Sequence, residues 1–449
     1  MLLEFKARNY KSFKDELCLS MIPDPDEHAL DYSVMTEQVA GETLQALCST
    51  VVYGPNASGK TNVISALDTF RRVVLRGNID NAENDPERFN PASFSLDLIP
   101  NNTIETPRPV EFSIRFLTGG VLIDYAFFAD LGDFLQIDYD RKILYESLSV
   151  NGISIFTRKN SVEADADSLK QFPEFFKENV SVNLDAIRSL PGWDVEPRQL
   201  FLCNGFSSLL SHALYKLITE WLSKQLETVC RSDRLSVVID SDALSVAMGI
   251  DKSKKDSLLM ANKIMNDAFS CIGAHNVIGY VYDPQQKRTR LASEVTKHVA
   301  IPAQVFESYG TYRFANLFPI LESAFLNGGT LVLDEFDASL HPMVLMNIIN
   351  LFHDPEINRN HAQLIFNTHN PIFLDRSLFR RDEIKFVERD EETQSSEIYA
   401  LSDFEPERDC EDYLGNYFRD RYGAIQYVDL TPVFRKIMEP DSGKEAGED

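Results

Sequence analysis

The sequence has no run of about 18 apolar residues, so no membrane-spanning helix is expected. The first ten residues alternate charged and apolar side chains and lack the apolar core of a signal peptide. The six cysteines are scattered without a close pair, which predicts neither a zinc site nor a disulfide framework. Together these absences favour a cytoplasmic protein with reduced thiols.

Positive charge is also in short supply. The chain has 44 Lys and Arg against 69 Asp and Glu, and its formal net charge is −25. Because proteins that bind nucleic acid usually present a basic surface, the charge does not indicate nucleic-acid binding, which would need a local basic patch or a partner. What the chain does have is size and apolar content: 449 residues, 44% of them hydrophobic, allow two or three domains with a large core.

The clearest motif follows the G-x-x-x-x-G-K-T pattern of a phosphate-binding loop: Gly54-Pro55-Asn56-Ala57-Ser58-Gly59-Lys60-Thr61. It follows the apolar run 49–53 and precedes a helical pattern over 62–75, which is the strand–loop–helix context that this loop requires. The glycines let backbone N–H groups surround phosphates at the start of the helix. Lys60 would place its charge on the β and γ phosphates, and Thr61 would offer a hydroxyl to Mg²⁺. The motif therefore predicts a site for ATP with Mg²⁺.

A second motif, over 329–335, is an unbroken apolar strand that ends in the adjacent carboxylates Asp334 and Glu335. The lack of alternation predicts burial on both faces. Asp334 would belong to the Mg²⁺ shell, and Glu335 would orient and polarise the attacking water. Together with the phosphate loop, this strand predicts ATP hydrolysis.

Two more segments complete the pattern. The apolar strand 363–367 leads to His369, which could reach the γ-phosphate as a switch, and the 35 residues between Asp334 and His369 leave room for one helix and one strand. Ser308 and Gly310 precede a helix expected over about 314–326, and a helix start of this kind is a candidate anion site.

The rest of the chain is expected to form mixed structure. Residues 2–8 read as a strand, and 111–116 with 121–129 read as an antiparallel hairpin. From about 161 to 271 the pattern is helical, and the best helix is expected over 207–229.

The order of these motifs, with the loop first, then the Ser-x-Gly helix start, the Asp-Glu strand and the histidine strand, resembles the ABC-type ATPases. The resemblance implies an α/β fold of the ABC-type P-loop class with an antiparallel β subdomain and an inserted helical subdomain. It also implies that Ser308 and Gly310 face the phosphates of a second protomer, so that ATP is sandwiched in a homodimer or a higher homo-oligomer. The expected parts are 1–160 and 300–390 as the two halves of the ATPase head, 161–299 as the helical insertion and 391–449 as an acidic extension.

Within that group, the loop opening Gly54-Pro55-Asn56 resembles the SMC and RecF branch. The segments 334–342 and 367–371 resemble the OLD-like ATPases of bacterial abortive-infection systems. The opening turn 9–13 fits this branch, in which it touches nucleotide, so Lys11 and Ser12 become candidate ATP contacts. The resemblance implies a sensor or regulatory subunit of an antiphage complex with a separately encoded effector, a nuclease or other toxin.

Two other functions stay open. An ATP-gated nuclease of the OLD type would carry a Toprim domain, but only about 80 residues follow His369, and neither 390–392 nor 409–412 contains an Asp-x-Asp set. A RecF-like DNA repair ATPase would bind DNA by itself in a salt-sensitive way, and the acidic charge disfavours it.

Overall fold

The computed structural model describes most of the chain. The described residues are 1–80, 98–134, 136, 139–177, 180, 196–230, 254–274, 276–283, 288–296, 299–406, 411–426 and 428–438. Within them, no helix is both long enough and apolar enough to cross a membrane.

A six-stranded sheet forms the centre of the fold, in the order β11-β15-β16-β5-β17-β18. Its strands are β5 (Ser49–Tyr53), β11 (Leu226–Val229), β15 (Thr330–Leu333), β16 (Gln363–Asn367), β17 (Ile384–Arg389) and β18 (Ser396–Ala400). The first five are parallel, and only β18 runs antiparallel, beside β17. Every residue of β5, β15 and β16 is buried, which explains the unbroken apolar runs in the sequence.

A second sheet is entirely antiparallel and has the strand order β10-β9-β8-β7-β6-β1-β2. The strands are β1 (Leu2–Arg8), β2 (Leu17–Ser20), β6 (Val110–Thr118), β7 (Val121–Asp130), β8 (Lys142–Val150), β9 (Ile153–Arg158) and β10 (Val162–Glu163). The predicted strand 2–8 and the predicted hairpin are both present. A separate hairpin pairs β3 (Val34–Val39) with β4 (Glu42–Leu47).

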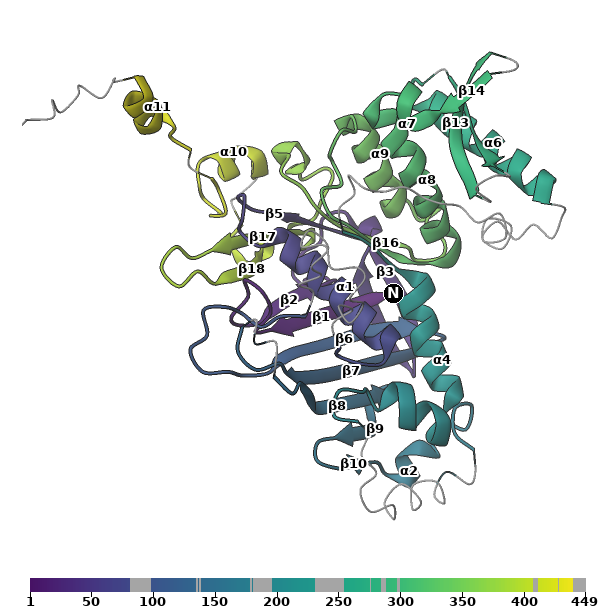
Figure 1. Cartoon of the computed structure of the whole chain (residues 1–449), viewed down its shortest axis with the longest axis vertical. Coiled ribbons are helices and arrows are strands. Elements are labelled where there is room, and N and C mark those ends of the chain that lie inside the picture. The colour runs from purple at the N-terminus through teal and green to yellow at the C-terminus, as the bar shows by residue number, and fades with distance from the viewer. Residues whose placement is uncertain are drawn as a thin grey trace, which may run out of the picture.

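Helix α1 (Lys60–Arg76) joins the two sheets (Figure 1). Its Phe70 ring stacks on Phe127 and meets Phe5 and Phe112 of the antiparallel sheet edge to face. The same core cluster contains Val332, Ile365 and Val387 from the central sheet. The helix that follows the phosphate loop is therefore fixed from both sides. The predicted α/β fold with an antiparallel β subdomain is confirmed.

The helix predicted over 207–229 is wrong in its extent. The chain forms a π-helical segment Leu202–Leu210, then α4 (His212–Glu220), a second π-helical segment Trp221–Gln225, and finally strand β11. Ser211 is extended and its side chain caps α4 by accepting from Leu214 N–H, which ends the first segment. The last four residues pair in parallel with β15, because this tertiary pairing outweighs the helical pattern of the apolar residues.

A third region lies beyond the central sheet, at the upper right of Figure 1. It contains α6 (Lys254–Cys271), the small sheet β12 (Val277–Asp283), β13 (Arg288–Thr296) and β14 (Val299–Pro302), and the helices α7 (Ala303–Phe306), α8 (Tyr309–Asn327) and α9 (Pro342–His353). The segment 161–299, expected to be a helical insertion, thus also supplies β11 to the central sheet and most of a small sheet. The four-part division of the chain stays a prediction.

The C-terminal part packs on β17 and β18 through α10 (Tyr413–Phe418) and the turn after it. Tyr399 donates to the carbonyl of Tyr422, and Tyr417 donates to that of Ala424. Short helices α2 (Ala166–Leu169) and α11 (Thr431–Met438) complete the described helices. In Figure 1, α11 projects away from the rest of the molecule.

Candidate nucleotide-binding site

The predicted loop Gly54–Thr61 joins the carboxyl end of β5 to α1, as the sequence indicates. Gly54 and Gly59 are needed for reasons of space. A Cβ on Gly59 would lie 2.7 Å from the hydroxyl oxygens of both Ser12 and Ser396, and a Cβ on Gly54 would meet the carbonyl of Val387. The backbone therefore passes here only with glycine, and φ is also positive at Gly59.

Lys60 points back into the loop. Its ammonium donates to the carbonyl oxygens of Gly54 and Pro55, each at 2.7 Å, and the residue is buried. Burial lowers its pKa to about 8, although the carboxylates of Asp334 and Glu335 act in the opposite direction. The buried Ser58 hydroxyl has no hydrogen-bond partner within the described residues. An unpartnered donor and a positive charge inside a glycine loop fit a phosphate group.

The proposed metal ligands Thr61 and Asp334 are brought together. Thr61 Oγ1 donates to Asp334 Oδ1 at 3.0 Å, and Asn367 Nδ2 donates to the same oxygen at 2.5 Å. A hydroxyl and a carboxylate are hard oxygen ligands of the kind that Mg²⁺ prefers. Among the described residues, no cluster of three or more His, Cys, Asp or Glu could hold a metal ion by itself. Mg²⁺ held here would therefore complete its shell with phosphate oxygens and water, which is how nucleotide-bound Mg²⁺ is usually held.

Glu335 has a backbone conformation that is rare for a non-glycine residue, with φ at 52°. Two side chains hold it there. Asn367 Oδ1 accepts from the Glu335 N–H at 2.5 Å, and Arg313 of α8 donates to the Glu335 carbonyl. Asn367 thus orients both carboxylate residues of the Asp-Glu strand, and Arg313 links that strand to the helix that begins at Ser308.

His369 lies at the exposed end of β16, two residues beyond Asn367. Partial desolvation lowers its pKa, the positive charge of Lys60 adds to the shift, and the carboxylates of Asp334 and Glu335 oppose it. Lys60, Asp334 and Glu335 all act on this pKa, so His369 lies near both the phosphate loop and the Asp-Glu strand. One helix, α9, and one strand, β16, separate it from Asp334, as the spacing predicts.

The opening turn lies against α1. Ser12 accepts from Asn62 Nδ2 at 2.8 Å and lies beside Gly59, so it is part of the loop's surroundings. Lys11 lies further along the helix, where its ammonium donates to Ser65 at 3.1 Å and sits over the ring of Tyr10.

Ser308 and Gly310 lie at the start of α8. Ser308 is exposed and caps the helix by accepting from Thr311 N–H. Gly310 is needed because a Cβ there would lie 2.5 Å from the carbonyl oxygen of Ser339, in the loop after the Asp-Glu strand. No hydrogen bond in the described part of the chain joins either residue to the phosphate loop.

Four more residues around the site are not among the predicted site residues. Ser396 donates to the Ser58 carbonyl at 2.6 Å, and Gln426 accepts from the Asn56 N–H at 3.1 Å. Cys230 follows β11, whose register with β15 places it beside Asp334, and burial raises the pKa of its thiol to about 12. Asn367 is the fourth.

Two of the acidic residues singled out after His369 have structural roles. Asp390 closes a turn by accepting from Thr393 N–H, and Asp412 caps α10 by accepting from Gly415 N–H. Residues 407–410, which include Asp409, lie outside the described part.

The loop between β5 and α1, with Asp334 and Glu335 at the end of a parallel strand in the same sheet, defines a P-loop ATPase domain of the AAA/ABC type. The chain belongs to the family described as "AAA domain, putative AbiEii toxin, Type IV TA system", whose model matches residues 49–195 and 286–375, more than half of the chain. The predicted relation to the ATPases of abortive-infection systems is confirmed by this match.

Three SMC head domains are among the solved structures similar to the chain. One is a crystal structure of the SmcHead bound to the C-winged helix domain of ScpA, with a TM-score of 0.46, 11% identity, and 89% of this chain and 97% of that chain covered. The SMC head domain from Thermotoga maritima has a TM-score of 0.35 and 14% identity, and the match covers 89% of this chain and 98% of that chain. The third is the Smc head domain with an extended coiled coil bound to the C-terminal domain of ScpA, derived from Pyrococcus furiosus. Its TM-score is 0.39 and its identity is 12%, and the match covers 89% of this chain and 96% of that chain. A search of curated proteins finds no match.

The lowered pKa of Lys60 predicts a pH dependence of ATP binding. Phosphate groups need the charged ammonium, so bound ATP raises the pKa of Lys60 above its free value of about 8. Affinity should be flat below about pH 7.5 and fall as pH rises through 8 to 9.5, by up to about tenfold per unit. Titration with a fluorescent ATP analogue at several pH values across this range measures the affinity.

Lys60→Arg is the matched control, because a guanidinium keeps its charge over the whole range. Its affinity should change little between pH 7.5 and 9.5, whatever its absolute value. Equal pH slopes for the parent and for Lys60→Arg would show that the charge of Lys60 does not govern binding.

Proposed function

We propose that the chain binds ATP with Mg²⁺ at the loop Gly54–Thr61 and hydrolyses it to ADP and phosphate. The observation that carries the proposal is the group of Thr61, Asp334 and Asn367, in which one carboxylate oxygen accepts two hydrogen bonds beside the buried Lys60. Three separate segments meet there: the start of α1, with Lys60 and Thr61, and the carboxyl ends of β15 and β16. Together they offer oxygen ligands for a metal ion next to a positive charge for phosphate, as the binding of a metal-bound triphosphate requires.

Each residue then has a role that follows from its chemistry. Lys60 and the loop N–H groups bind the β and γ phosphates, and Ser12 holds the loop in place. Thr61 and Asp334 bind Mg²⁺, which would neutralise charge on the phosphates when bound. Glu335, fixed by Asn367 and Arg313, orients the attacking water. His369 has a ring N–H to donate to the γ-phosphate, and Lys11 is a second positive charge that could contact the nucleotide.

The active form that we propose is a head-to-tail homodimer, or a higher homo-oligomer, that encloses ATP. Ser308 and Gly310 support this proposal, since they form an exposed helix start without a hydrogen bond to the chain's own loop in the described residues. The positive end of the α8 dipole attracts anions. The phosphates of a second protomer are the anions that such a dimer would bring to it.

Ser308→Arg should block the sandwich and leave ATP binding to the single chain intact. The side chain is exposed, so the larger residue does not disturb the core, but it would occupy the space of the second protomer's phosphates. Turnover should fall to the background rate, while titration with a fluorescent ATP analogue gives the parental affinity for the monomer. If Ser308→Arg hydrolyses ATP at the parental rate, Ser308 is not part of the active site.

In its cellular role, we propose a cytoplasmic sensor or regulatory ATPase of an antiphage, abortive-infection complex, with a separately encoded nuclease or toxin as effector. The family description, which names an AbiEii toxin and a Type IV TA system, supports this context. Co-expression with the product of the adjacent gene, followed by mass spectrometry of what co-purifies, tests it. A pure chain that by itself cleaves plasmid with Mg²⁺ would instead favour the single-chain nuclease.

A further inference from the structure

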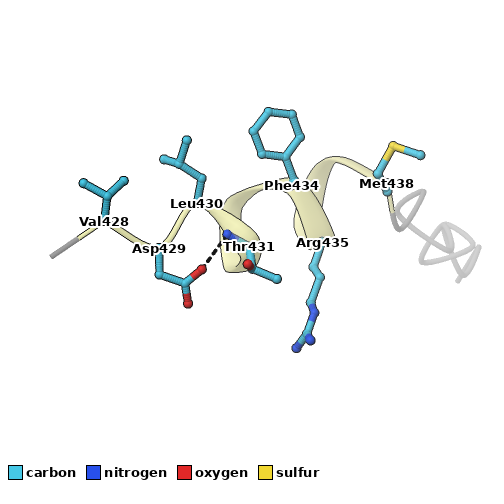
Figure 2. A pocket seen from close by; sticks show the side chains of 7 residues that line it. All are labelled: Val428, Asp429, Leu430, Thr431, Phe434, Arg435 and Met438. Carbon is cyan, nitrogen blue, oxygen red and sulfur yellow. Dashed lines mark hydrogen bonds between the residues drawn. The ribbon is translucent and has the colours of Figure 1, made fainter.

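The C-terminal helix α11 carries an apolar face that nothing in the described chain covers. The residues of this C-terminal apolar face are Val428, Leu430, Val433, Phe434, Ile437 and Met438, each between 53% and 77% exposed. Figure 2 shows Val428, Leu430, Phe434 and Met438 on one side of the segment and Asp429 and Arg435 on the other. Their spacing of three and four residues is that of a helix which lies in an apolar groove.

The chain connects this face to the phosphate loop. Gln426 accepts from the Asn56 N–H at 3.1 Å, and Val428 follows only two residues later. Two residues span at most about 7 Å, so the C-terminal apolar face begins beside the nucleotide site. Tyr417 and Tyr399 hold the turn that precedes Gln426 by donating to the carbonyl oxygens of Ala424 and Tyr422.

A second exposed apolar surface flanks the other half of the proposed site. Val305, Phe306 and Tyr309, here called the helix-start patch, surround Ser308 and are 77%, 43% and 51% exposed. They belong to the end of α7 and the first turn of α8. Exposed apolar groups that cluster at one place mark an interaction surface.

Charge favours a contact between these two surfaces in different copies. Thr431–Met438 contains Arg435 and Lys436 and no carboxylate, although the whole chain has a net charge of −25. Glu307 lies between the residues of the helix-start patch in the sequence, and Asp337 lies in the loop that packs on Gly310. Opposite charges at the rim of an apolar contact set its orientation.

We propose that α11 of one protomer packs its apolar face on the helix-start patch of a second copy and latches the ATP-bound dimer. This inference rests on the proposed head-to-tail sandwich. There the phosphate loop of one chain faces Ser308 of the other, so the helix beside the loop meets the patch beside Ser308, twice by symmetry. Because Gln426 contacts Asn56, the latch also connects dimer closure to the phosphate loop.

The test measures the protein concentration at which half of Glu335→Gln is dimeric with Mg²⁺ and ATP, by sedimentation. Adding Phe434→Ser and Ile437→Ser should raise this concentration about 10–100-fold, since burial of large apolar side chains contributes strongly to association. Val305→Ser with Phe306→Ser should have an effect of the same size. Leu326→Ser, at the far end of α8 and 50% exposed, is the matched control and should have no effect.

A cross-linking experiment identifies the occupant. Ile437→Cys and Val305→Cys are prepared as separate proteins, mixed with Mg²⁺ and ATP, and treated with a short bismaleimide. A covalent dimer should form only in the mixture and only with ATP, and each protein alone reports background from the native cysteines.

The outcomes separate the latch from the sandwich. If Glu335→Gln dimerises with ATP and its α11 and patch variants dimerise at the same concentration, the latch is wrong and the sandwich stands. If one chain that carries both cysteines cross-links within itself as a monomer, α11 folds onto its own patch, and the latch is again wrong. If Glu335→Gln binds ATP but forms no ATP-dependent dimer, both the latch and the sandwich fail.

Discussion

Glu335→Gln is expected to keep ATP binding and to lose turnover by roughly 10²–10⁴-fold, the usual effect of removing a general base. The amide is isosteric with the carboxylate, and the residue is held by its backbone through Asn367 and Arg313. The substitution should therefore leave the geometry of Asp334 and Thr61 unchanged. Phosphate release under saturating ATP and Mg²⁺ measures the loss.

Asp337→Asn is the matched control for charge. Asp337 lies two residues further along the same loop and also acts on the pKa of Lys60, so its loss removes one negative charge from the site without touching the Asp-Glu pair. Its turnover should stay within a few-fold of the parent. If Glu335→Gln hydrolyses ATP at the parental rate, Glu335 is not the base.

Lys60→Ala is expected to abolish ATP binding at concentrations that saturate the parent. The ammonium is the positive charge buried in the loop, with Gly54 and Pro55 as its hydrogen-bond partners. The substitution removes the positive charge that would bind the phosphates. It also removes the two hydrogen bonds that hold the loop carbonyls. Calorimetric titration with ATP and Mg²⁺ should give no heat of binding, and turnover should be at background.

Lys11→Ala separates this effect from a general loss of positive charge. Lys11 is bonded to Ser65 on the flank of α1, away from the loop carbonyls. The variant should still bind ATP, with an affinity between those of the parent and Lys60→Ala. Parental affinity in Lys60→Ala would mean that the nucleotide binds elsewhere.

Local sequence patterns predict the parts of the site that lie within one segment. The loop 54–61 and the strand before Asp334 carry their geometry in consecutive residues, because burial and glycine conformation leave few other choices. The same holds for β16, whereas α8 begins at Tyr309, five residues before the helix start expected at about 314.

The parts that depend on contacts between distant segments could not be predicted. Asn367 orients Asp334 and Glu335 across a strand pair, and Gln426 reaches Asn56 from 370 residues further along the chain. Strand β11 was hidden inside a helical pattern, since only its pairing with β15 makes it a strand. A single sequence contains no local sign of such pairings.

The sandwich proposal is tested most directly by the mass of Glu335→Gln in solution, measured by light scattering with Mg²⁺ and either ATP or ADP. The proposed site predicts twice the monomer mass with ATP, the monomer mass with ADP, and the monomer mass with ATP when Ser308→Arg is added. A mass with ATP that equals the mass with ADP, in a variant shown to bind ATP, would contradict a site completed by Ser308 and Gly310 of a second copy.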